Sequence, residues 1–191
     1  MVSLTALMGF LLFAAPATLR APEAATPVPV AEATVAPAYR VTVTAYNAVP
    51  EQTDDTPHET ASGAYANPEV IAARSQDLAE KLPFGTVIEF DGADISSKHT
   101  CGYSVVASRI GYRVIADTMN ARYADRIDIL FNTKADYATA ERGMRNAAEV
   151  LGVCVGASIR VVGHIEIRNI PKTQAELAAL IGDTNTDLAL K

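Results

Sequence analysis

From residue 39 onward, short apolar and β-branched segments alternate with polar turns. Residues 40–46 (RVTVTAY), 86–90 (TVIEF) and 126–131 (RIDILF) have the Val, Ile, Thr and aromatic content typical of strands. We expect further strands at 103–107 and 112–116, joined as a hairpin around 108–111, and at 150–155 and 158–167. Between them lie a long polar loop at 47–62, a short buried segment at 70–73 and a turn at 82–85.

Two capping patterns predict helices among these strands. Thr133 with Asp136 predicts a helix that runs towards Gly143, and Thr173 with Glu176 forms a capping box before the apolar residues 177–181. Residues after Asp183 should fray. Many short strands with one or two short helices predict a mainly β fold, a small β-barrel, instead of a βαβ fold.

The first 38 residues differ from this body. Residues 4–15 are almost unbroken apolar, too short for a membrane span of about 20 residues but suited to a signal peptide that ends at Ala15-Pro16-Ala17. Residues 1–17 are therefore a signal peptide or, since no Lys or Arg precedes the apolar run, a weak membrane anchor. Residues 18–38 form a Pro/Ala-rich disordered linker, 39–170 the folded domain, and 171–191 a short helix with a frayed tail.

Composition excludes several functions. The formal net charge is −6 and no block of Lys or Arg occurs, which disfavours a nucleic-acid partner or an anionic membrane surface. Trp is absent and aromatic residues make up 6%, which weakens any interpretation built on aromatic sugar platforms. Any membrane contact should go through the N-terminal apolar segment.

The chain has two cysteines, Cys101 and Cys154. In an exported protein this pair is a disulfide candidate, and two unpaired buried thiols are the alternative. Two Cys and three scattered His (His58, His99 and His164) are too few ligands for a metal site, and no cofactor is expected.

Two aspartates lie at the edges of apolar segments. Asp117 follows residues 114–116, and Asp128 lies between Ile127 and Ile129. On a strand Asp128 shares a face with Leu130, and such a setting raises the pKa of a carboxyl group towards neutrality. The alternative role for such an aspartate is to cap a turn.

Six short segments, in order, resemble the three-aspartate domain found in membrane-bound lytic transglycosylase A and in stationary-phase survival proteins of the bacterial wall. They are VTAY at 43–46, TASG at 60–63, SQDL at 75–78, LPFGT at 82–86, ADTMN at 116–120 and RIDI at 126–129. The resemblance implies a six-stranded double-psi β-barrel that cleaves peptidoglycan outside the cytoplasm, in the periplasm, the cell envelope or the extracellular space. The three aspartates of the family fall on Asp77, Asp117 and Asp128.

This resemblance also implies a mechanism with one catalytic acid. In a lytic transglycosylase the C6 hydroxyl of the sugar attacks its own anomeric carbon, so no water is activated. We expect Asp128 to be the acid and base, with Asp117 and Asp77 tuning and positioning it. Substrate should contact Tyr46, Thr60, Ser62, Gly63 and Asn120, although Asp77 could instead cap a helical turn and Asn120 could hold a turn.

Two other functions remain open from the sequence. The same barrel could be a non-catalytic module that binds peptidoglycan and loosens the wall, as in expansin-like proteins. An aspartic protease is suggested by residues 115–118 (IADT), but that motif needs Gly where this chain has Met119, and a second copy would have to come from a homodimer.

Overall fold

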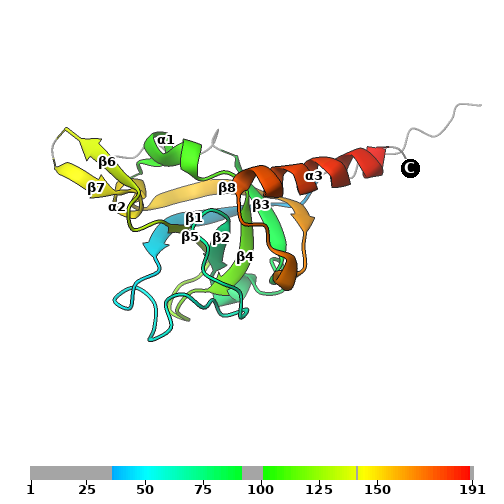
Figure 1. The fold of residues 1–191 in the computed structure, drawn as a ribbon, viewed down its shortest axis with the longest axis horizontal. Helices are drawn as coiled ribbons and strands as arrows, with labels where there is room; N and C mark the ends of the chain where they lie inside the picture. The colour runs from blue at the N-terminus through cyan, green and yellow to red at the C-terminus, as the bar shows by residue number, and fades with distance from the viewer. Residues whose placement is uncertain (1–35, 92–100, 141, 190–191) are drawn as a thin grey trace, which may run out of the picture. The chain divides into compact units, whose positions relative to one another are not determined.

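The computed structural model describes residues 36–91, 101–140 and 142–189 (Figure 1). The predicted signal segment, nearly all of the linker, and His99 lie outside the described residues. The described elements belong to one compact unit, Val35–Lys191. None of the described helices is long and apolar enough to cross a membrane.

Six strands close into a barrel in the order β1-β5-β2-β4-β3-β8, so the prediction of a six-stranded barrel is confirmed. Two neighbouring pairs are parallel, β1 with β5 and β2 with β4, and the other four pairs are antiparallel. The parallel pairs are nested along the chain, because β2 and β4 both lie between β1 and β5. The strands are β1 (Ala38–Asn47), β2 (Ile71–Arg74), β3 (Thr86–Asp91), β4 (Arg113–Thr118), β5 (Arg126–Phe131) and β8 (Cys154–His164).

Alternation along the strands separates the core into two clusters. One cluster contains Ile127 and Ile129 and draws on all six strands. The other contains Leu130 and includes Leu177 and Ile181 of the C-terminal helix. The two faces of β5 therefore pack in different clusters, as the alternation predicts.

The helix predicted from Thr133 towards Gly143 is wrong. These residues form the hairpin β6 (Asp136–Thr139) and β7 (Gly143–Asn146), which lies beside the barrel in Figure 1. Gly143 has φ +69°, and its carbonyl accepts a hydrogen bond of 2.8 Å from the Thr139 hydroxyl, which closes the turn between the two strands. The helix starts later, at α2 (Ala147–Leu151), where the Asn146 side chain accepts from the Ala148 N–H.

Two predicted strands are also wrong, wholly or in part. Residues 103–107 are not a strand but form α1 (Tyr103–Val106) and the 3₁₀ turn Ala107–Arg109, because Val106 and Ile110, four residues apart, both reach the core. The strand predicted at 150–155 is split: α2 ends at Gly152, with φ +63°, and β8 starts at Cys154. The predicted strands at 40–46, 86–90, 112–116 and 126–131 are confirmed.

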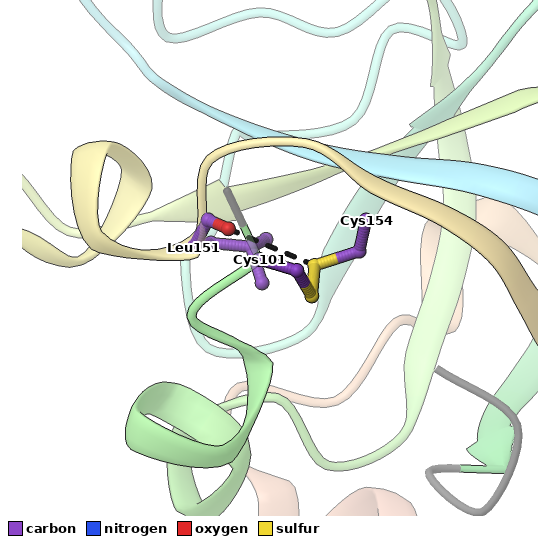
Figure 2. The surroundings of a disulfide bond; sticks show 3 residues. All are labelled: Cys101, Leu151 and Cys154. Atoms are coloured by element: carbon purple, nitrogen blue, oxygen red, sulfur yellow. Dashed lines mark hydrogen bonds between the residues drawn. A yellow bond between two sulfur atoms is a disulfide. The ribbon is translucent and has the colours of Figure 1, made fainter. Parts of the chain in front are cut away.

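The disulfide Cys101–Cys154 is present and closes a separation of 53 residues (Figure 2). The Cys154 sulfur lies 3.6 Å from the Leu151 carbonyl oxygen; a disulfide sulfur carries no hydrogen, so this is a packing contact. Gly102 approaches so closely that a Cβ there would lie 2.0 Å from the Val150 oxygen. The disulfide thus fastens the start of α1 against α2 and the first residue of β8.

The second capping box is confirmed. The Thr173 hydroxyl accepts from the Glu176 N–H, and the Glu176 carboxylate accepts from the Thr173 N–H. The helix α3 spans Gln174–Ala189, longer than the sequence predicts, and it packs on the barrel through Leu177 and Ile181. The last predicted strand ends at His164, before the 3₁₀ turn Ile167–Asn169.

Candidate active site

A cavity of about 890 Å³, here called the aspartate cavity, brings Asp117 and Asp128 together. Its floor comes from four neighbouring barrel strands, and its walls come from residues in the loops 51–61 and 119–123. Carboxylates outnumber cations in this lining, since Glu51, Asp54 and Glu59 join the two aspartates and Arg122 is the single cation among its described residues. The strand residues of the floor are Ala45, Tyr46, Ala73, Asp117, Thr118 and Asp128.

Asp128 is the partly buried acid of this cavity. It lies opposite Thr44 in the parallel register of β1 and β5, and the Thr44 hydroxyl donates to Asp128 Oδ1 at 2.7 Å. Burial raises the pKa of Asp128 to about 6; the Thr44 hydrogen bond and the Arg126 charge oppose this rise, and the charge of Asp117 adds to it. The protein surrounds most of the carboxyl group, but the group keeps one side on the cavity.

Asp117 differs because donors occupy both of its oxygens. Oδ2 accepts from the Tyr46 hydroxyl at 2.8 Å. Oδ1 accepts from the Ala61 N–H and from its neighbour Thr118, each at 2.9 Å. Three hydrogen bonds hold the Asp117 carboxyl group in place, so neither of its oxygens is left open to the cavity in the way that the Asp128 carboxyl group is.

Ala73 on β2 separates the two aspartates. Its Cα is registered with Asp128 on one side and with Asp117 on the other. A β-bulge between Ala72 and Ala73 sets this register with β4. Because the Ala73 side chain is a single methyl group, both carboxyl groups can share one cavity.

Tyr46 connects β1 to β4 through its hydrogen bond to Asp117. The ring is 8% exposed, and burial together with the charge of Asp117 raises the pKa of the phenol well above 10. The phenol therefore stays protonated near neutral pH and can donate its hydrogen bond to Asp117. Tyr46 lines the aspartate cavity, and its contact with substrate stays a prediction.

Asp77 is not among the residues that line this cavity. It lies in the 3₁₀ turn Gln76–Leu78, and its carboxylate accepts from the Asp125 N–H at 2.9 Å. Hydrogen bonds from Ser75 and from Asp125 lower the pKa of Asp77. Since Asp125 has φ 48° and immediately precedes β5, Asp77 holds the turn that starts the strand of Asp128.

The segment 60–63 is divided between two cavities. Thr60 and Ala61 line the aspartate cavity, whereas Ser62 and Gly63 line a neighbouring one. The Thr60 hydroxyl is 3.0 Å from the Ser62 hydroxyl and also donates to the Ala64 carbonyl. Gly63 has φ +82° with open space where a Cβ would be, so the turn conformation, and not crowding, requires glycine.

Asn120 lines the aspartate cavity and also holds a turn, because its Oδ1 accepts from the Arg122 N–H at 3.1 Å. Thr44 was not predicted as a site residue, although it lies two residues before Tyr46 on the same strand face. Ala61 and Ala73 were not predicted either, because Ala61 contributes a backbone N–H and Ala73 contributes only its small volume. Neither contribution has a signature in residue type.

No group of three or more His, Cys, Asp or Glu side chains among the described residues is arranged to hold a metal ion. No protein-family model matches this sequence, and no curated protein matches it either. The closed six-stranded barrel is the part of the three-aspartate resemblance that the structure bears out.

Proposed function

We propose that this protein is a peptidoglycan lytic transglycosylase, with Asp128 as its acid and base. The observation that carries the proposal is the contrast between two carboxyl groups in one cavity. Asp128 has a pKa of about 6 and is reachable from the cavity, whereas both oxygens of Asp117 are occupied by hydrogen bonds from three donors. Glycoside hydrolysis needs a second carboxylate that acts on water or on the sugar, and Asp117 is poorly placed for either role.

One proton carrier is sufficient for intramolecular cleavage. Protonated Asp128 gives its proton to the glycosidic oxygen as the bond from this oxygen to C1 breaks. The C6 hydroxyl of the same sugar then bonds to C1 and returns its proton to the Asp128 carboxylate. The products are a 1,6-anhydro end and a new free hydroxyl, with no water consumed and Asp128 protonated again.

Surrounding residues support this role. The Asp117 anion favours positive charge at the anomeric carbon in the transition state and the protonated form of Asp128. Asp77 is a positioning residue that fixes the start of β5. The Cys101–Cys154 disulfide favours an oxidising compartment, which is where peptidoglycan is found.

Product chemistry tests the proposal. The full chain would be incubated with purified peptidoglycan, and soluble fragments would be analysed by mass spectrometry. We expect 1,6-anhydro ends, lost in Asp128→Asn and kept in Asp55→Asn, a control at an exposed aspartate that lines neither this cavity nor its neighbour. Reducing ends would show hydrolysis; sedimentation with the wall without products would show a binding module. Either result would contradict the proposal.

A further inference from the structure

A second cavity, of about 1000 Å³, adjoins the aspartate cavity across one loop. Residues 59–61 of this loop line the aspartate cavity, and residues 62–65 line the second one. The Thr60 and Ser62 hydroxyls, 3.0 Å apart, lie at the division. A polymer that lies in one cavity can therefore reach the other cavity by crossing this loop.

The second cavity, here called the tyrosine cavity, contains an exposed aromatic ring. Tyr65 is 69% exposed, although its ring lines the cavity. The ring stacks on His58 with centroids 6.2 Å apart and planes at 21°, and its backbone forms a bridge with Glu59. These contacts hold one face of the ring and leave an apolar surface available for a ligand.

The walls of the tyrosine cavity are tied together before any ligand binds. Asn67 donates from Nδ2 to the Lys172 carbonyl at 2.9 Å, which joins the loop of Tyr65 to the opposite wall. Gly85 has φ +94° and lies so close to Ile165 that any side chain there would collide with the Ile165 carbonyl. The residues 164–172 are therefore fixed against the barrel, and the cavity is preformed.

The charge of this cavity is opposite to that of its neighbour. Among the lining residues Arg168 and Lys172 are cations, and Glu166 is the single carboxylate, paired with Arg168 at 2.7 Å. Lys172 thus supplies a net positive charge in a chain whose formal net charge is −6. A ligand that carries carboxylates is attracted here and repelled from the acidic loop of the aspartate cavity.

We infer that the tyrosine cavity is a second subsite for the glycan strand, which continues into it from the aspartate cavity. The C–H face of a sugar packs on the Tyr65 ring, and a carboxylate of the attached peptide lies near Lys172. This inference rests on the proposed function for its ligand, because peptidoglycan combines a sugar polymer with anionic peptides. It assigns binding, not chemistry, to the residues of this cavity.

Binding can be measured without turnover in the full-length Asp128→Asn variant, by sedimentation with intact peptidoglycan. Adding Tyr65→Ala should weaken binding about three- to tenfold, as expected for loss of one stacking ring, and Tyr65→Phe should restore it. Lys172→Gln should also weaken binding. Met144→Ala, which removes another exposed side chain outside both cavities, should have no effect.

The active chain gives an independent readout. With long glycan strands Tyr65→Ala should raise KM and leave kcat unchanged, and with fragments too short to reach the tyrosine cavity neither value should change. Unaltered sedimentation of the Tyr65→Ala variant would overturn the subsite. If no anhydro products form but this variant still binds less, the proposed function fails and the subsite stands.

Discussion

The hydroxyl of Thr44 donates a 2.7 Å hydrogen bond to Asp128, across the parallel pair β1 and β5. This bond is the largest influence that holds the pKa of Asp128 down against burial. Its strength therefore helps to set the pH range in which the carboxyl group is protonated and can act as an acid.

Thr44→Val should shift the pH dependence of cleavage. The proposed mechanism starts from protonated Asp128, so kcat/KM should fall as the pH rises above about 6. Valine keeps the shape and removes the donor, which raises the pKa of Asp128 and moves this fall to higher pH. An unchanged pH profile of anhydro-product release would contradict Asp128 as the titrating acid.

Asp128→Asn should stabilise the folded protein near neutral pH. The folded pKa of about 6 lies above the ordinary 3.8, so the folded state keeps a proton between these values that the unfolded state releases. The free energy of unfolding therefore falls as the pH rises from about 4 to 6, by up to about 3 kcal/mol. Urea denaturation should show the variant gaining up to this amount at pH 7 and little at pH 4. A variant that is less stable than the wild type at pH 7 would contradict the destabilising effect of the buried Asp128 carboxylate.

Tyr46→Phe should reduce both the stability of the fold and the rate of cleavage. It removes one of three donors to Asp117, at a cost of about 1–3 kcal/mol in the free energy of unfolding, and it loosens the carboxylate beside Asp128. We expect kcat to fall about 10- to 100-fold in protein that is still folded. Tyr112→Phe, outside the aspartate cavity, is the control and should keep full activity.

Two substitutions at Asp77 separate chemistry from positioning. Asp77→Ala removes the acceptor for the Asp125 N–H and should lower both stability and kcat, because the start of β5 is loosened. Asp77→Asn keeps an acceptor oxygen and should restore most of both. If the two variants were equally inactive while equally stable, Asp77 would need its charge for the reaction.

Arg113→Met should destabilise the barrel by about 3 kcal/mol or more, measured by urea denaturation. The Arg113 side chain is fully buried and donates to five backbone carbonyls, including those of Ile110 and Leu130. Burial lowers its pKa to about 10, so it remains a cation near neutral pH. Arg160→Met, which breaks an exposed pair with Glu89, should cost less than about 1 kcal/mol.

The predictions that succeeded depend on local pattern. Alternation predicts the strand at 126–131, and it places Asp128 on the face of that strand away from Ile127 and Ile129. The capping box at Thr173 follows from the spacing of two side chains. The predictions that failed lie where local preference is weak. The hairpin at 136–146 carries cap-like residues, and the strand-like Val105 and Val106 are turned into helix by packing of Val106 and Ile110 and by the disulfide before them.

The sequence by itself determined five of the six barrel strands, the apolar setting of Asp128 and the candidate cysteine pair, whereas β2 was expected only as a short buried segment. Only the tertiary structure decided that Asp117 is held by three donors, that Ala73 leaves room between the aspartates, and that Asp77 holds a turn outside the aspartate cavity. Alternation and capping act between residues close in the chain, so they can be read along it. A cavity forms from strands that meet by barrel closure, and its backbone donors and small side chains have no pattern of their own.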